Sequence, residues 1–74
     1  MPLYFKLEAI EPNRRVVIHA EVFEELRVNI SKHGQSVPIL IYQHGSSFRI
    51  IDGEKRWRVI KSLGQKTILA ELES

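Results

Sequence analysis

Asp52-Gly53-Glu54-Lys55-Arg56-Trp57-Arg58 decides the fold, because an apolar run from Phe48 to Ile51 gives way here to a helical pattern. The start of a helix leaves backbone N–H groups without acceptors and carries about half a unit of positive charge. One glycine and three basic side chains lie at this junction, and the basic side chains strengthen the positive field. The junction therefore predicts a binding site for an anion such as a phosphate.

Arg56 projects into the apolar face of the predicted helix. At about 100° per residue, the apolar arc consists of Trp57, Ile60 and Leu63. A guanidinium that faces a core is costly unless it is paired. Arg56 is therefore expected to meet either a bound anion or an internal carboxylate, Asp52 or Glu54, and the glycine and the helix start favour the bound anion. Trp57 is expected in the core.

Length and composition predict a single small domain over residues 1–74. The chain has no cysteine, which excludes disulfides, thiolate metal sites and a cysteine nucleophile. Its three histidines are scattered, without the spacing of metal ligands. No stretch resembles a signal peptide or a membrane span, so we expect a cytoplasmic protein that does not bind membranes.

The charge is distributed unevenly along the chain. The net charge is only +2, yet residues 49–66 hold six Lys and Arg residues against two acidic ones. Such a patch suits the phosphates of a nucleotide or of nucleic acid, and a solvated helix face is the alternative.

Hydrophobic periodicity predicts four strands and two helices. The strands are expected at residues 3–10, 38–42, 48–51 and 67–72, and the helices at residues 20–33 and 54–63. The second and third strands form a hairpin, and Gly34 and Gly64 end the two helices. The expected buried faces are Leu3, Phe5, Leu7 and Ala9 in the first strand, and Val22, Phe23, Leu26 and Ile30 in the first helix. This pattern predicts an α/β or α+β domain with a small mixed sheet.

Four motifs, in chain order, resemble the N-terminal domain of ParB-type partition proteins. They are Ile10-x-Pro12-Asn13, Leu26-x-x-x-Ile30-x-x-His33-Gly34, x-x-x-Pro38-Ile39-Leu40 and Ile51-Asp52-Gly53-Glu54-Lys55-Arg56-Trp57-Arg58. In that family the last box usually reads Gly-Glu-Arg-Arg-aromatic-Arg-Ala, so Lys55 and Val59 are substitutions. The match spans about residues 7–72 and implies the ParB/sulfiredoxin fold.

The resemblance implies a nucleotide site formed by the last box and by the segment that leads into Pro38. In partition proteins the ligand is CTP with Mg²⁺, and its binding closes a clamp on DNA. By this resemblance Gly53 lets the backbone approach the phosphates, and Lys55 and Arg56 contact them. Arg58 and Pro38 belong to the same implied site. The implied function is nucleotide binding in DNA partition, in chromosome or plasmid segregation, or in its regulation.

Glu54 is the residue on which an enzymatic alternative depends. It has either a metal-associated, water-orienting role with Mg²⁺, as the catalytic residue of a nucleotide hydrolase, or it only complements the helix dipole. Domains of this kind also carry the label ParB-like nuclease, and Asp52 with Glu54 is the only carboxylate pair near the basic segment. Sulfiredoxin has a nucleophilic cysteine where this chain has Glu54, so its reductase chemistry is excluded.

Arg14, Arg15 and Lys61 are the expected contacts to DNA or phosphate. In partition proteins a helix-turn-helix domain and a dimerisation domain follow this segment, so DNA binding is expected together with other domains or partners, and a homodimer is a further expectation. The sequence leaves open whether the chain is a fragment or a stand-alone module. Val37 replaces the family's Gln before the proline, and Arg14-Arg15-Val16 replaces its Gln-Pro-Arg. These departures favour a third alternative, a nucleotide-independent adaptor or inhibitor domain.

Overall fold

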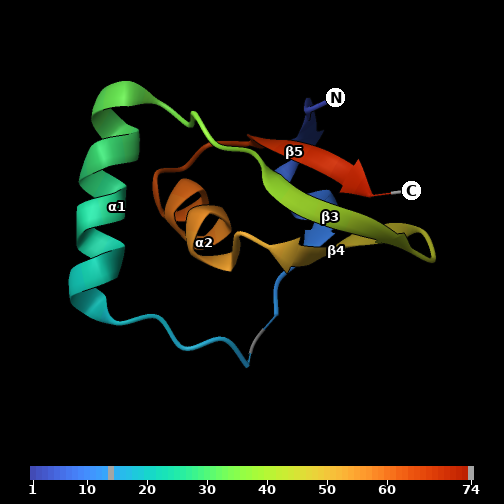
Figure 1. Ribbon diagram of the computed structural model, residues 1–74, viewed down its shortest axis with the longest axis horizontal. Coiled ribbons are helices and arrows are strands. Elements are labelled where there is room, and N and C mark those ends of the chain that lie inside the picture. The colour runs from blue at the N-terminus through green and yellow to red at the C-terminus, as the bar shows by residue number, and fades with distance from the viewer. Residues whose placement is uncertain (14, 74) are drawn as a thin grey trace.

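The computed structural model describes residues 1–13 and 15–73 (Figure 1). Its strands are β1 (Leu3–Lys6), β2 (Ile10–Glu11), β3 (Ile39–His44), β4 (Ser47–Asp52) and β5 (Thr67–Glu73). Its helices are α1 (Ala20–His33), α2 (Glu54–Ser62) and the 3₁₀-helix η1 (Leu7–Ala9). Both predicted α-helices, the hairpin and the last strand are confirmed.

The five strands form one mixed sheet in the order β1-β5-β3-β4-β2. The β3–β4 hairpin and the β1–β5 pair are antiparallel. The β3–β5 and β2–β4 pairs are parallel, and each has the long crossover connection, here including a helix, that a parallel pair requires. The predicted fold class, two helices with a small mixed sheet, is therefore confirmed.

The prediction of one continuous strand over residues 3–10 is wrong, since η1 separates β1 from β2 and these lie at opposite edges of the sheet. If the sheet were flat, its two edge strands would lie about 19 Å apart, because neighbouring strands are spaced by about 4.8 Å. The chain from Lys6 to Ile10 reaches at most about 14 Å. The sheet must therefore curl, and the rings of Phe5 on β1 and Phe48 on β4 do meet, with centroids 5.2 Å apart.

The short strand β2 is held on β4 by side chains as well as by the backbone ladder. The Glu11 carboxylate accepts a hydrogen bond from the Ser47 hydroxyl at 2.9 Å and one from Arg49 Nε at 3.2 Å. These bonds favour the charged carboxylate, so the Ser47 hydroxyl and the Arg49 guanidinium lower the pKa of Glu11.

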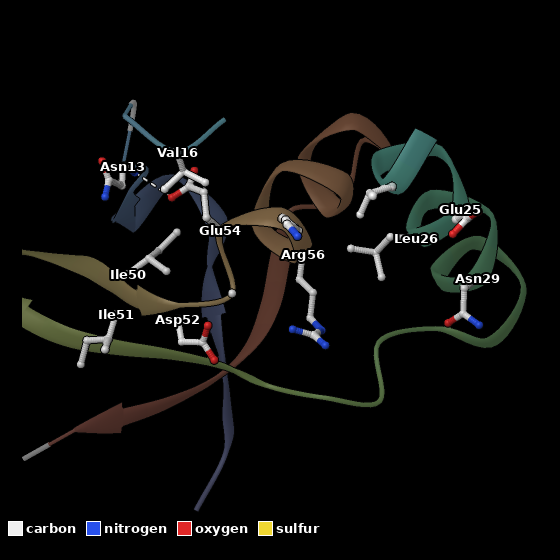
Figure 2. Close-up of a pocket in the computed structure, with 13 residues that line it drawn as sticks. Asn13, Val16, Glu25, Leu26, Asn29, Ile50, Ile51, Asp52, Glu54 and Arg56 are labelled. Carbon is white, nitrogen blue, oxygen red and sulfur yellow. Dashed lines mark hydrogen bonds between the residues drawn. The ribbon is translucent and has the colours of Figure 1, made fainter. Parts of the chain in front are cut away.

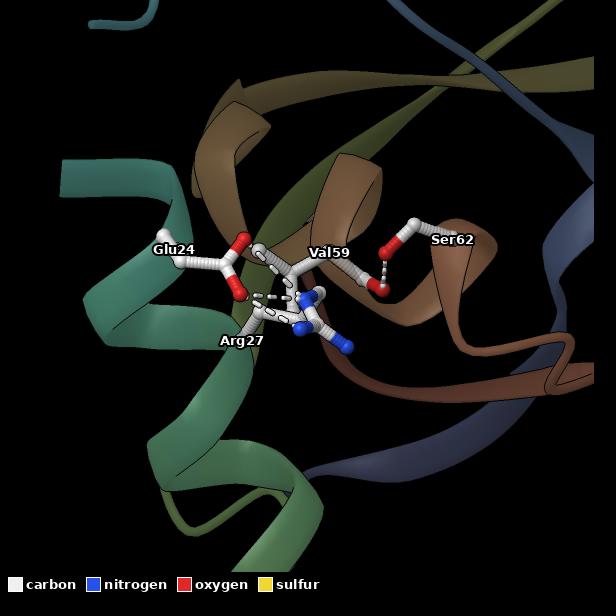
Figure 3. Close-up of polar contacts among 4 residues, drawn as sticks. All are labelled: Glu24, Arg27, Val59 and Ser62. Atoms are coloured by element: carbon white, nitrogen blue, oxygen red, sulfur yellow. Dashed lines mark hydrogen bonds and ion pairs between the residues drawn. The ribbon is translucent and has the colours of Figure 1, made fainter. Parts of the chain in front are cut away.

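The two helices lie side by side, with α2 between α1 and the sheet (Figure 1). Helix α1 ends as predicted at Gly34, whose N–H donates to the Ile30 carbonyl at 2.8 Å. Figure 3 shows an ion pair between Glu24 and Arg27 on α1, and on α2 the Ser62 hydroxyl, which donates to the Val59 carbonyl at 2.6 Å.

The core lies between the curled sheet and the inner faces of both helices. Its most deeply buried side chains, all at most 2% exposed, are Ile10, Ile39, Ile41, Val59, Ile60, Ile68 and Ala70. Trp57 is 6% exposed, which confirms its expected place in the core. Three predicted core residues lie outside it. Ala9 is only partly buried, because it lies in η1 and not in a strand. Leu3 is 62% exposed because it begins an edge strand, and Val22 is 41% exposed because it faces a cavity rather than α2.

Gln35 completes the sheet where β3 begins. Pro38 precedes β3 and has no N–H, so it cannot extend the ladder toward β5. The Gln35 side-chain amide accepts from the Leu69 N–H and donates to the Leu69 carbonyl, both at 2.8 Å, and it also donates to the Val37 carbonyl at 3.0 Å. One side chain therefore replaces a backbone pair in the ladder and fixes the link between α1 and β3.

We predict that Gln35→Ala lowers the free energy of unfolding by about 1–3 kcal/mol, because both polar groups of Leu69 lose their partner. Urea denaturation measures the change. Gln43→Ala is the matched control, since the Gln43 amide makes one exposed bond of 3.4 Å to the Gly45 carbonyl, and it should change stability by less than about 0.5 kcal/mol. Equal losses in the two variants would contradict this role of Gln35.

Candidate functional site

A cavity of about 660 Å³ opens where α2 begins (Figure 2). Its walls come from the link between β2 and α1, from one side of α1, and from the junction of β4 with α2. The lining residues are Asn13, Val16, Val22, Glu25, Leu26, Asn29, Ile50, Ile51, Asp52, Gly53, Glu54, Lys55 and Arg56. This volume lies within the range of about 300–1,000 Å³ that is usual for small-molecule sites.

Gly53 forms the junction between strand and helix. Its φ is +109°, and a Cβ atom there would lie 2.5 Å from Ile39 Cγ2 and 3.1 Å from Ile39 Cα. Only glycine fits both the left-handed backbone and the close approach to β3. The first N–H groups of α2 lack intrahelical acceptors, and no side chain caps this helix start. The junction therefore presents backbone donors at one wall of the cavity.

Arg56 is half-buried and extends into this cavity (Figure 2). In the described part of the chain, its guanidinium forms no hydrogen bond and no ion pair with any protein group. The internal pairing with Asp52 or Glu54, one of the two sequence-based alternatives, is therefore absent among the described residues. A half-buried guanidinium without a partner is a ready donor to an anion.

The cavity combines charged and apolar walls. Lys55 and Arg56 supply positive charge at the start of α2, and Asp52 and Glu25 supply carboxylates nearby. The other walls include the apolar side chains of Val16, Val22, Leu26 and Ile50. A ligand that fits both parts carries an anionic group and a less polar body.

Glu54 and Arg58 belong to the predicted site but are bonded to the protein itself. Glu54 is only 7% exposed, and its two carboxylate oxygens accept from the Asn13 N–H at 2.7 Å and from Arg58 Nε at 3.0 Å. Arg58 Nη2 donates to the Asn13 carbonyl at 3.1 Å. Neither Arg58 nor Pro38 lines the cavity. The catalytic and metal-binding roles expected of Glu54 stay predictions.

The expected DNA contacts lie in different elements. Arg14 lies outside the described residues. Arg15 is exposed in the link before α1, where its N–H donates to Asn13 Oδ1 at 3.0 Å. The Lys61 ammonium lies 5.2 Å from the centre of the Trp57 ring. Their contact with DNA stays a prediction.

The sequence interpretation missed the wall of the cavity that α1 supplies. Glu25 and Asn29 lie about thirty residues before Arg56 in the chain, and no local spacing relates them to it. The one available signal was the apolar stripe of α1, whose Val22 and Leu26 have more apolar surface than the contact with α2 buries.

A mixed curled sheet with two helices, and a helix that starts at a glycine directly after a strand, define the class of this domain as sulfiredoxin-like and ParB-like. The family model for the ParB N-terminal domain matches residues 4–74, and the chain belongs to this family. It is 35% identical over 75 residues to the nucleoid occlusion protein of Geobacillus kaustophilus, covering 96% of this chain and 27% of that protein. It is also 35% identical over 68 residues to a probable chromosome-partitioning protein ParB of Campylobacter jejuni. That match covers 88% of this chain and 24% of the Campylobacter protein.

Solved structures agree with this assignment. A C-terminally truncated ParB of Caulobacter crescentus in complex with CTP-γ-S superposes with a TM-score of 0.88 and 25% identity, over 100% of this chain and 44% of that one. The same partition protein in complex with the centromeric parS site superposes with a TM-score of 0.86 and 26% identity. The match covers 97% of this chain and 40% of that one. Sulfiredoxin of Arabidopsis thaliana shares the fold, with a TM-score of 0.89 and 24% identity. The match covers 100% of this chain and 85% of that one.

The chain spans about a quarter of the length of the curated relatives it matches. Neither described helix is long and apolar enough to cross a membrane. Among the described residues, no group of three or more His, Asp or Glu side chains is placed to hold a metal ion by itself.

We predict that Gly53→Ala lowers the free energy of unfolding by about 2–5 kcal/mol, from about 1–2 for the left-handed backbone and about 1–3 for the overlap with Ile39. Gly45→Ala is the matched control, because Gly45 has a φ of +63° and open space around its Cα. It should cost only the backbone contribution of about 1–2 kcal/mol. Denaturant unfolding of both variants would contradict the packing argument if the two losses were equal.

Proposed function

We propose that this domain binds a nucleoside triphosphate, CTP in the first place, with the triphosphate at the start of α2. The observation that carries the proposal is the half-buried guanidinium of Arg56, which has no partner among residues 1–13 and 15–73. It lies beside a helix start that none of these residues caps, in a cavity of about 660 Å³. Backbone N–H groups and a planar guanidinium together suit phosphate oxygens, and a helix start favours negative charge.

The apolar part of the cavity favours a nucleotide over a bare phosphate. Val16, Val22 and Leu26 offer an apolar surface for a base or a sugar in the same cavity as Lys55 and Arg56. The truncated ParB of Caulobacter crescentus, which was solved with CTP-γ-S, supports the choice of cytosine nucleotide.

Mg²⁺ fits the same cavity as a companion of the phosphates. This ion takes one or two carboxylates together with phosphate oxygens. Asp52 and Glu25 line the cavity and have no hydrogen-bond or ion-pair partner among the described residues, whereas both oxygens of Glu54 are engaged. Asp52, which directly precedes the Gly53 junction, would hold the ion together with the phosphates, whereas Glu25 lies across the cavity on α1 (Figure 2). Mg²⁺ would neutralise phosphate charge.

The nucleotide-bound domain would act in DNA partition or its regulation, together with other domains or with partners. The family of the chain, its relatives named for chromosome partition and nucleoid occlusion, and the parS complex of the Caulobacter protein support this role. Arg15 and Lys61 remain the proposed contacts to DNA.

We predict that CTP with Mg²⁺ gives saturable heat in isothermal titration calorimetry, and that Arg56→Ala weakens the affinity by about 10- to 100-fold through loss of a charged hydrogen bond. UTP, ATP and GTP are titrated in parallel. Lys66→Ala, which removes one positive charge outside this cavity, is the matched control and should bind like the parent.

Two outcomes would contradict the proposal. One is the absence of saturable heat with all four triphosphates. The other is equal binding by the parent and Arg56→Ala.

A further inference from the structure

Both backbone polar groups of Asn13 are held by side chains of α2. The Asn13 N–H donates to Glu54 Oε1 at 2.7 Å, and the Asn13 carbonyl accepts from Arg58 Nη2 at 3.1 Å. Arg58 Nε closes the set with a bond of 3.0 Å to Glu54 Oε2. Asn13 and Glu54 are 41 positions apart in the chain, so this contact joins two remote segments.

The charges in this arrangement compensate each other. A carboxylate as buried as that of Glu54 is costly unless it is paired and hydrogen-bonded, and here it is both. The guanidinium of Arg58 donates through Nε to a carboxylate and through Nη2 to a carbonyl. Because the guanidinium is planar, the directions of its Nε–H and Nη2–H bonds are fixed relative to each other. The ammonium of a lysine has no such fixed pair of donors.

The anchored residue begins the link that closes one side of the cavity. Asn13 and Val16 both line the cavity, and Asn13 Oδ1 accepts from the Arg15 N–H at 3.0 Å. The Val16 N–H donates to the Asn13 carbonyl at 3.3 Å. The described residues between β2 and α1 form no helix or strand. The hydrogen bonds of Asn13 therefore fix the position of this link at the side of the cavity.

Arg58 does not face the cavity. The residues around it, Pro12, Trp57, Lys61 and Ser62, line a separate shallow hollow. Its two bonds direct the guanidinium to Glu54 and Asn13, whereas Arg56, two residues earlier, extends into the cavity without a partner.

We propose that Glu54 and Arg58 are positioning residues, which hold Asn13 and so preform the wall of the nucleotide cavity without contacting the phosphates. This inference rests on the proposed function, because it assigns roles within the same site. It gives the two arginines of the 53–58 box different roles: Arg56 binds the ligand, and Arg58 shapes the site. A preformed wall lowers the ordering cost of binding and so raises affinity for any ligand that uses the cavity.

The test compares CMP, CDP and CTP by calorimetry in the parent and in two variants. Arg58→Lys should weaken all three nucleotides by a similar factor, about fivefold, because the wall is shared by all of them. Arg56→Ala should weaken CTP by a larger factor than CMP, because its partner is phosphate. Arg49→Lys is the matched control, since Arg49 pairs with Glu11 away from the cavity, and it should bind like the parent.

A second measurement needs no nucleotide. Hydrogen exchange of the Asn13 amide, followed by NMR, should be slow in the parent and at least about tenfold faster in Arg58→Lys, because Glu54 loses the partner that holds it toward Asn13. Glu54→Gln should also speed this exchange while retaining a side-chain oxygen of the same shape.

The outcomes are distinct. A penalty for Arg58→Lys that grows with the number of phosphates, as for Arg56→Ala, would assign Arg58 to the ligand and overturn the inference. Unchanged exchange of Asn13 in both Arg58→Lys and Glu54→Gln would overturn it as well. The absence of binding by the parent would instead overturn the proposed function, and with it the positioning role, even where the exchange data establish the anchor.

Discussion

The close approach of the Gly53 backbone to Ile39 is the contact on which the site depends. With a φ of +109° and no Cβ, the chain leaves β4 and enters α2 against the side of β3. The start of α2 is thereby fixed to the central strand of the sheet, whose Ile39 and Ile41 are at most 1% exposed. This contact sets the direction in which the first N–H groups of α2 point.

The connection between β1 and β2 imposes a second constraint. Three residues of η1 join strands that lie at opposite edges of a five-stranded sheet, so the sheet curls until Phe5 meets Phe48. The curl also brings the residues after β2 to α2, where Asn13 meets Glu54 and Arg58. A short connection between the two edges of the sheet thus helps to determine one wall of the cavity.

The basic residues near the start of α2 differ in their surroundings more than in their chemistry. Arg56 and Lys55 line the cavity, Arg58 is bonded to Glu54 and Asn13, and Lys61 lies over the Trp57 ring. The ParB and sulfiredoxin structures share the fold of this domain. Within the described residues, the partners of these basic side chains distinguish them from one another, and the fold alone does not.

The sequence by itself determined the local elements. The apolar stripe and Gly34 placed α1 correctly, two apolar runs placed the hairpin, and the glycine followed by basic residues marked the start of α2. These features depend on backbone preferences and on contacts between near neighbours, which spacing reports directly. The tertiary structure alone decided the break between β1 and β2, the role of Gln35 beside Leu69, and the separate surroundings of Arg56 and Arg58. Each of these depends on a partner more than thirty residues away, or on the order of strands in the sheet, and a periodic pattern contains no information about either.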